Sequence, residues 1–237
     1  MTETRIALIS GANRGIGAAT AQRLFEAGWS LSLGMRNPAF PDWAKGIAGA
    51  EERIHLAPYD AADPESATIW AAGAMARFDR IDALVANAGI MIPKTVIEIE
   101  DDEMAQLLEI NVQGPRRLAA ACWDALGASG KGRVIILGSL SGKRIKSARS
   151  GAYSVSKFAA VGLAHALRHT GFEAGIRATA VCPGFVATDM AMALTDRAAT
   201  AMTDPKDLAR VIEMLIELPN EASTAEFCVN CQLEESF

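Results

Sequence analysis

Tyr153 and Lys157 lie four positions apart in a stretch whose apolar spacing predicts a helix over Gly151–Gly171. That spacing places both side chains on one face of the helix. A free tyrosine has a pKa of about 10, and a nearby ammonium group lowers that pKa by favouring the phenolate. The pair therefore predicts a proton donor and acceptor, although a Tyr-x-x-x-Lys pair by itself is more often an amphipathic surface pair.

Two polar residues that precede this helix could complete such a site. Ser139 directly follows the apolar run Arg133–Gly138, and its hydroxyl could donate to a substrate oxygen that gains negative charge during a reaction. Asn111 is an amide in a largely apolar run, where a helix kink or a buried amide is the plain alternative. Ser141 is the second candidate for the serine, but Ser139 is preferred because it directly follows the strand.

A glycine-rich loop joins the first apolar run to the first helical stretch. Its three glycines allow a tight turn and a close approach to a pyrophosphate, which the N–H groups at the start of the helix would bind. A structural turn is the alternative, but the position of the loop favours a nucleotide. The candidate cofactor residues here are Gly11, Asn13, Arg14, Gly15, Ile16 and Gly17.

The end of the second predicted strand indicates which nucleotide is bound. An NAD site places a carboxylate there for the ribose 2′-hydroxyl, and the sequence Ser32-Leu-Gly-Met-Arg36 has none. Arg36, together with Arg14 in the glycine loop, would suit a 2′-phosphate. We therefore expect NADP(H) as the preferred cofactor. The alternative is that these are two surface arginines and that NAD(H) is used.

Short apolar runs alternate with longer helical stretches along the chain. The predicted strands are Arg5–Ser10, Ser30–Met35, Ile54–Tyr59, Ala83–Asn87, Arg133–Gly138, Ile176–Cys182 and Ala225–Asn230. The predicted helices are Gly15–Ala27, Pro64–Phe78 with Asp63 as N-cap, Asp102–Leu126, Gly151–Gly171, and Pro205–Leu218 with Asp204 as N-cap. This pattern predicts an α/β fold, with a doubly wound, Rossmann-type parallel sheet of about seven strands, helices on both faces, and a single domain over residues 1–237.

Taken together, these residues resemble the short-chain dehydrogenase/reductase family across nearly the whole chain. The matching motifs stand at strand ends and in family order: Gly11-x-x-x-Gly15-x-Gly17, Asp60, Asn87-Ala88-Gly89, Asn111, Ser139-x-x-Gly142, Tyr153-x-x-x-Lys157 and Pro183-Gly184. Any one of them could occur by chance, but the full ordered set is specific. Two positions depart from the family, because Ser10 replaces a usual Thr and Ala86 replaces a usual Asn.

The resemblance implies an oxidoreductase that interconverts a carbonyl and an alcohol by hydride transfer. It implies that Tyr153 donates or accepts the proton, assisted by Lys157 and Ser139. It further implies that Asn111 holds a water that relays protons through the lysine. Asp60 would bind the adenine amine, and the other candidate cofactor residues beyond the glycine loop are Asn87, Ala88, Gly89, Tyr153, Lys157, Pro183, Gly184, Val186 and Thr188.

Two segments near the expected site could select the substrate. The segment 143–149 holds four cations in seven residues, and we hypothesise that it attracts an anionic substrate such as a keto acid. A solvated loop, or one that binds only the cofactor, is the alternative. The Met- and Ala-rich segment from Thr188 to Asp204 could form a flexible apolar lid, or its methionines could serve packing alone.

Composition limits the partners and the location that we expect. The chain has 237 residues and a net charge of −5, which gives no reason to expect a nucleic-acid partner. No apolar run approaches the length of about 20 residues needed to cross a bilayer, and Ile6–Ile9 is too short for a signal-peptide core. We therefore expect a cytoplasmic protein, with no membrane partner, that acts on a small molecule. The resemblance implies a homodimer or homotetramer formed through the helices over 102–126 and 151–171.

Two cysteine or histidine pairs have the spacing of metal ligands. Cys228 and Cys231 form a Cys-x-x-Cys pair, and His165 and His169 are four apart. Neither pair has an accompanying second pair or third ligand at the expected spacing, so no metal site is predicted.

Two functional alternatives to the enzyme described remain. One is a dehydrogenase of the same family that prefers NAD(H). The other is a non-catalytic NADP(H)-binding sensor, which would be free to lose a catalytic residue. The sequence keeps all four of them, which favours the enzyme: Asn111, Ser139, Tyr153 and Lys157.

Overall fold

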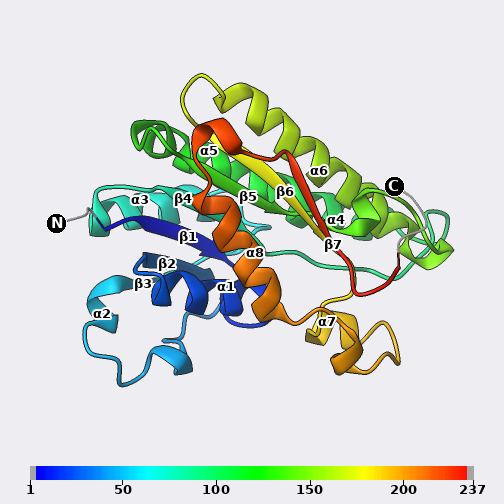
Figure 1. Cartoon of the computed structure of the whole chain (residues 1–237). Coiled ribbons are helices and arrows are strands. Elements are labelled where there is room, and N and C mark those ends of the chain that lie inside the picture. The colour runs from blue at the N-terminus through cyan, green and yellow to red at the C-terminus, as the bar shows by residue number, and fades with distance from the viewer. Residues whose placement is uncertain (1–3, 234–237) are drawn as a thin grey trace.

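The computed structural model describes residues 4–233. Seven strands form one parallel sheet in the order β3-β2-β1-β4-β5-β6-β7 (Figure 1). Their bounds are β1 Ile6–Ser10, β2 Ser30–Met35, β3 Ile54–Pro58, β4 Ala83–Ala86, β5 Arg133–Leu137, β6 Arg177–Pro183 and β7 Glu226–Val229. The strand order reverses between β1 and β4, and in such sheets this switch point is where ligands bind.

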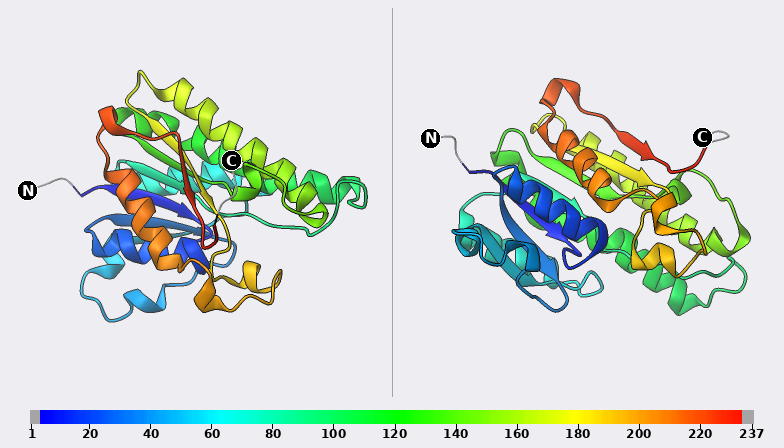
Figure 2. Two further views of the ribbon diagram at one scale, coloured as in Figure 1. Left: turned by 45° about the vertical axis from the view of Figure 1, so that its right-hand side comes forward. Right: turned by 60° about the horizontal axis from the view of Figure 1, so that its bottom comes forward.

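Helices cover both faces of the sheet. On one face α1 (Gly15–Glu26) and α8 (Pro205–Glu217) lie side by side, as the right view of Figure 2 shows. On the other face lie α3 (Ser66–Phe78), α5 (Gly114–Ala128) and α6 (Gly151–Gly171). Each layer encloses its own apolar core, one around Leu8 and Leu118 and the other around Ile9 and Leu24. The predicted fold class, a Rossmann-type sheet with helices on both faces, is confirmed.

Burial accounts for the composition of the strands. Every residue of β1, β2, β4, β5 and β6 is buried, so both faces of these strands are covered and most of their side chains are apolar. Strand β2 is the exception, because it alternates Ser30 and Ser32 with leucines. The edge strand β7 has only one neighbour, β6, and its residues are partly or fully exposed. The last strand is therefore the most accessible part of the sheet.

The helices differ from the prediction in three places. The helix expected over 102–126 is α4 (Asp101–Leu108), a π-helical turn (Glu109–Gln113) and α5. The N-cap of α3 is Glu65, while Asp63 caps only the preceding turn by accepting from the Glu65 N–H at 3.0 Å. The short helices α2 (Ala50–Arg53) and α7 (Asp189–Met192) were not predicted, since one turn carries too little periodicity to be recognised.

Among residues 4–233, no helix combines the length and the apolar character that a membrane span requires.

Candidate active site

A cleft of about 1020 Å³ opens beyond the carboxyl ends of the strands and receives side chains from segments that are far apart in the sequence. Of the 19 predicted site residues, 17 line this cleft. Ser139 is one of them, and the other 16 follow here. They are Gly11, Asn13, Arg14, Gly15, Ile16, Arg36, Asp60, Asn87, Ala88, Gly89, Tyr153, Lys157, Pro183, Gly184, Val186 and Thr188. Two predicted residues, Gly17 and Asn111, are not among the lining residues, and each lies behind the wall.

The glycine loop is shaped by positions that have no room for a side chain. Gly11 and Gly15 have φ angles of +66° and +55°, a region that favours glycine. A Cβ on Gly17 would lie 2.2 Å from the Gly11 carbonyl oxygen and 2.6 Å from Asn87 Nδ2. Gly17 therefore permits the close packing of α1 against the loop, and the loop in turn directs its backbone into the cleft.

A buried hydroxyl joins the ends of β1 and β4. Ser10 is only 2% exposed, and its Oγ accepts from the backbone N–H groups of Asn87 and Ala88, both at 3.0 Å. The Asn87 side chain returns the contact by donating from Nδ2 to the carbonyl oxygens of Ser10 and Gly11. The retained hydroxyl of Ser10 thus fixes the switch point between the two central strands, a role the sequence alone did not indicate.

Three charged side chains border the cleft where β1, β2 and β3 end. Arg14 donates from Nη1 to Asp189 Oδ2 at 2.8 Å, and both side chains are largely exposed. Arg36 follows β2 directly and is exposed. Asp60 is exposed and accepts from the Ala62 N–H at 3.0 Å, which orients its carboxylate. Two guanidinium groups and one carboxylate are therefore available to a ligand at this end.

Ser139, Tyr153 and Lys157 meet where β5 and α6 reach the cleft. Ser139 Oγ accepts from the Ser141 N–H at 3.1 Å, and Lys157 Nζ donates to the Leu137 carbonyl oxygen at 2.7 Å. Lys157 Nζ lies 5.7 Å from the centre of the Tyr153 ring. Tyr153 and Lys157 are only 8% and 7% exposed. The arrangement brings a hydroxyl donor, a phenol and an amine together in a partly desolvated corner.

Burial controls the protonation of this group. It raises the pKa of Tyr153 to about 12, although the hydrogen bond from Ser139 opposes the rise. Burial also lowers the pKa of Lys157 to about 8, because the charged ammonium loses its hydration. The expected lowering of the tyrosine pKa by the lysine is therefore not found in this structure. Tyr153 stays protonated at neutral pH, as a proton donor must be.

Asn111 lies in the π-helical turn and is 2% exposed. Its Oδ1 accepts from the Ile90 N–H at 2.9 Å, and its Nδ2 donates to the Ile90 carbonyl oxygen and to Ser156 Oγ, both at 3.0 Å. A Cβ on Gly89 would lie 3.0 Å from this Oδ1 and 3.7 Å from Lys157 Nζ. Asn111 thus fixes the loop after β4 against α6, directly behind Gly89 and the lysine.

The segment after β6 closes the cleft beside the glycine loop. Thr188 caps α7, and a Cβ on Gly15 would lie 3.1 Å from the Thr188 side chain. In Figure 1, α7 lies beyond the tips of the strands, at the end of the sheet opposite the start of β1. Met190 and Leu194 line the cleft, as a lid over a substrate would, and Met190 is 42% exposed.

The basic segment and the C-terminal end of the described chain also contribute to the cleft wall. Arg144, Lys146 and Arg149 of the basic segment line the cleft, whereas Lys143 turns away and donates to Glu226 Oε2 at 2.5 Å. At the C-terminal end, Gln232 and Asn230 also line it. Residues 234–237 lie outside the described residues.

Known proteins share this architecture. The chain is 36% identical over 234 residues to an agropine synthesis reductase of Rhizobium rhizogenes, and this match covers 98% of the chain but 54% of the relative. It is 32% identical over 197 residues to the 3-oxoacyl-[acyl-carrier-protein] reductase FabG of Salmonella typhimurium, covering 82% of the chain and 78% of the relative. The chain therefore spans about half the length of the first relative and most of the second.

A solved structure matches as well. It is an alcohol dehydrogenase from the archaeon Thermococcus sibiricus complexed with 5-hydroxy-NADP, with a TM-score of 0.83 and 27% identity over 95% of this chain and 96% of that one. The family profile described as short chain dehydrogenase matches residues 5–199. With its ordered motifs, its sheet and its cleft, the chain belongs to the short-chain dehydrogenase family.

Proposed function

We propose that this protein is an NADP(H)-dependent oxidoreductase that interconverts a carbonyl and an alcohol. The observation that carries the proposal is that Ser139, Tyr153 and Lys157 line one cleft with the glycine loop. The names of the matched reductases and of the alcohol dehydrogenase support the same reaction class. Residues 1–237 would act as one domain.

The proton chemistry follows from the burial of these side chains. A nicotinamide cofactor would supply or accept the hydride. During reduction the carbonyl oxygen gains negative charge, which the Ser139 hydroxyl stabilises as Tyr153 donates its proton. Lys157, with a pKa lowered to about 8, can replace that proton near neutral pH. Asn111 holds the wall behind the lysine and is a positioning residue.

The preference for NADP(H) rests on charge at the ends of the first two strands. Arg36 is exposed directly after β2, where an NAD site would need a carboxylate. Arg14 lies across the same cleft and is held by an exposed ion pair with Asp189. Such a pair is worth little, so a 2′-phosphate can replace Asp189 as its partner. Asp60 is available to the adenine amine.

The substrate that fits this cleft carries an anionic group. Arg144, Lys146 and Arg149 line the same cleft as Tyr153, so three of the four cations of the basic segment face the space that a substrate would enter. Their fields would attract a carboxylate or phosphate and orient the carbonyl that it accompanies. Met190 and Leu194 supply an apolar border for the rest of the molecule.

A homodimer or homotetramer in the cytoplasm is the proposed working form. Val155 and Phe158 on α6 are 40% and 45% exposed, so this helix presents apolar side chains at its surface. A second copy of the chain that covers α5 and α6 would bury them. Size measurement of the purified chain by light scattering tests this part separately, and a monomer would contradict it.

The decisive measurement is a fluorescence titration of the purified protein with NADPH and with NADH. We expect NADPH to bind at least about tenfold more tightly, since charge-assisted hydrogen bonds are worth about 1.5–3 kcal/mol each. Arg36→Ala and Arg14→Ala should weaken NADPH binding without changing NADH binding. Arg116→Ala, a change of an exposed arginine that does not line the cleft, is the control.

Three outcomes would redirect the proposal. Equal or tighter NADH binding would show a dehydrogenase that prefers NAD(H). NADPH binding with no turnover in a screen of anionic and neutral carbonyls would identify a non-catalytic sensor. If neither nucleotide binds, the assignment of the glycine loop as a nucleotide-binding loop is wrong.

A further inference from the structure

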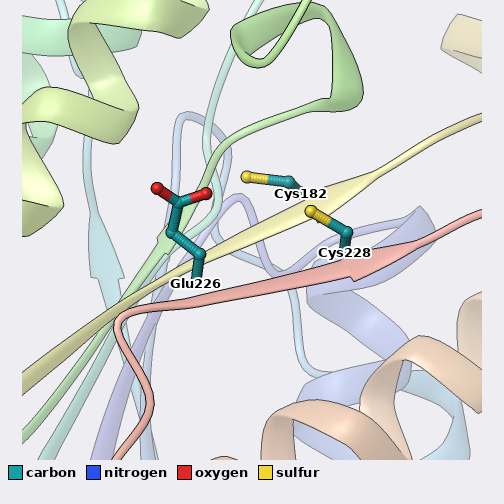
Figure 3. Close-up of side chains that lie close together, drawn as sticks. All are labelled: Cys182, Glu226 and Cys228. Atoms are coloured by element: carbon teal, nitrogen blue, oxygen red, sulfur yellow. The ribbon is translucent and has the colours of Figure 1, made fainter. Parts of the chain in front are cut away.

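A cluster of metal-ligating side chains lies on the last two strands, outside the catalytic cleft. Glu226 and Cys228 stand two positions apart on β7 and therefore share one face of that strand. Cys182 on β6 is the register partner of Cys228. The two sulfur atoms and a carboxylate oxygen of Glu226 all lie within 4.8 Å of one another. Figure 3 shows the three side chains on the same side of the two strands.

We propose that Cys182, Cys228 and Glu226 form a binding site for a thiophilic divalent cation, with Zn²⁺ as the ion they suit best. Thiolate sulfur combined with a carboxylate oxygen is a zinc ligand set. Zinc–sulfur distances of about 2.3 Å in a tetrahedron bring two sulfurs to about 3.8 Å from each other. The ligand atoms lie within 4.8 Å of one another, so each pair needs to close by about 1 Å or less.

The charges and hydrogen bonds around the cluster fit a bound cation. Two thiolates and one carboxylate exceed the charge of Zn²⁺ by one, and the Lys143 ammonium, 2.5 Å from Glu226 Oε2, balances the difference. His165 Nε2 lies 2.7 Å from Glu226 Oε1 and orients the carboxylate. Groups that hold a ligating side chain in this way raise metal affinity. His165 is therefore a positioning residue of the site.

Access to the site is open on one side. Cys182 is fully buried, whereas Cys228 on the edge strand is solvent-accessible, so an ion can enter past it. Three protein ligands leave a fourth position for water. The three proposed metal ligands do not line the catalytic cleft. The Cys182 sulfur does lie 3.0 Å from where a Cβ on Gly138 would stand, beside Ser139.

The site should act on stability rather than on the chemical step. A bound ion would join the edge strand β7 to β6, and β7 leads into Asn230, which lines the cleft. The sequence predicted no metal, and the Cys-x-x-Cys spacing pairs Cys228 with Cys231. The structure pairs Cys228 with Cys182 instead, through a strand register that sequence spacing cannot reveal.

The test uses the full chain, reduced and stripped of metal, titrated with Zn²⁺ and with Co²⁺ as a spectroscopic probe. We expect one Zn²⁺ per chain by elemental analysis after gel filtration, and a thiolate-to-Co²⁺ charge-transfer band. At a hundredfold excess of free Zn²⁺ over its Kd, the Tm should rise by about 5 °C or more. Cys228→Ser should abolish the band and the Tm rise, and His165→Ala should weaken Zn²⁺ binding by about tenfold.

Cys231→Ser is the matched control, since it removes the neighbouring thiol that lies outside the cluster. It should bind Zn²⁺ like the wild type. Three results would each overturn the proposal. They are no thiolate band with wild-type protein, unchanged Zn²⁺ affinity in Cys228→Ser, or equal losses in Cys231→Ser and Cys228→Ser. NADPH titration of every variant verifies that it is folded, because none of these residues lines the cleft.

Discussion

The glycine loop after β1 and the first turns of α6 border the same cleft, but they are built by different means. The loop depends on missing side chains, because Gly11 and Gly15 adopt positive φ angles and Gly17 admits no Cβ. The start of α6 depends on side chains that are present and buried, Tyr153 and Lys157. Under the proposed function, the first region would offer backbone N–H groups to an anion, and the second would offer protons to a reacting oxygen.

Because of this difference, we expect mutations to have different effects in the two regions. In the loop, an added Cβ crowds neighbouring atoms, which are the Gly11 carbonyl oxygen at Gly17 and the Thr188 side chain at Gly15. The damage there is steric and should affect binding and folding together. In α6, removal of a single oxygen or charge leaves the packing intact and changes only protonation. The comparison is therefore tested by mutations that change either the packing of the loop or the proton transfer by α6, but not both.

The largest effect is expected from Tyr153→Phe. The change removes the proton donor and little volume, so turnover should fall by about 10³-fold, within the range for loss of a general acid. NADPH affinity should change by less than about twofold, because backbone contacts of the loop remain. Steady-state kinetics and nucleotide titration measure both.

Tyr59→Phe is the matched control for that variant, since the chain has only two tyrosines and Tyr59 also lines the cleft. It should keep its turnover. Full activity in Tyr153→Phe would mean that another group donates the proton, which would contradict the assignment of Tyr153 as the proton donor.

Gly17→Ala should destabilise the fold by about 3 kcal/mol and weaken NADPH binding together. Its Cβ would stand 2.2 Å from the Gly11 carbonyl oxygen, so the loop must shift. Gly73→Ala on α3 is the control, because an added Cβ there comes no closer than 3.4 Å to the His55 side chain, an ordinary contact. There alanine should be neutral or stabilising in a helix. Equal urea midpoints for the two variants would contradict the steric account.

The buried lysine should give the protein an unusual pH dependence. The pKa of Lys157 is lowered to about 8 in the folded state and returns to its ordinary value on unfolding. Between these pKa values the unfolded chain binds more protons, so stability rises with pH. Relative to Lys157→Met, the wild type should gain about 2 kcal/mol in unfolding free energy between pH 8 and about 10.

Tyr153 sets the upper end of the pH range over which stability rises. Its pKa is raised to about 12, so its contribution to stability is lost only as the pH rises from its ordinary value toward 12. Denaturant unfolding of both proteins at several pH values makes the comparison. Parallel stability curves for wild type and variant would mean that Lys157 is not desolvated.

The smallest effect is expected where the loop does use a side chain. Ser10→Ala would leave the N–H groups of Asn87 and Ala88 without their buried acceptor, at a cost of about 1–2 kcal/mol in unfolding free energy. Ser10→Thr keeps the hydroxyl and should restore most of that stability. If the alanine and threonine variants unfold alike, the hydroxyl does not hold the switch point.

Much of the fold could be predicted from the sequence, because each strand is a short apolar run and each helix has a clear end. Strands β2 and β5 and helix α6 match their predicted bounds within a residue. The π-helical turn at Asn111 could not be predicted, since its longer hydrogen-bonding ring leaves no mark in apolar spacing. The N-cap of α3 was misplaced for a related reason, because Asp63 and Glu65 are both polar and only the backbone distinguishes them.

The ordered motifs at the strand ends determined the family, the sheet and the residues that border the cleft. Those features depend on local spacing and on side-chain type, which the sequence states directly. Only the tertiary structure decided that burial raises the pKa of Tyr153, that Asn230 and Gln232 complete the wall, and that Cys182 meets Cys228. Each of these depends on contacts between segments far apart in the chain. Neither desolvation nor strand register can be predicted from the spacing of residues along the sequence.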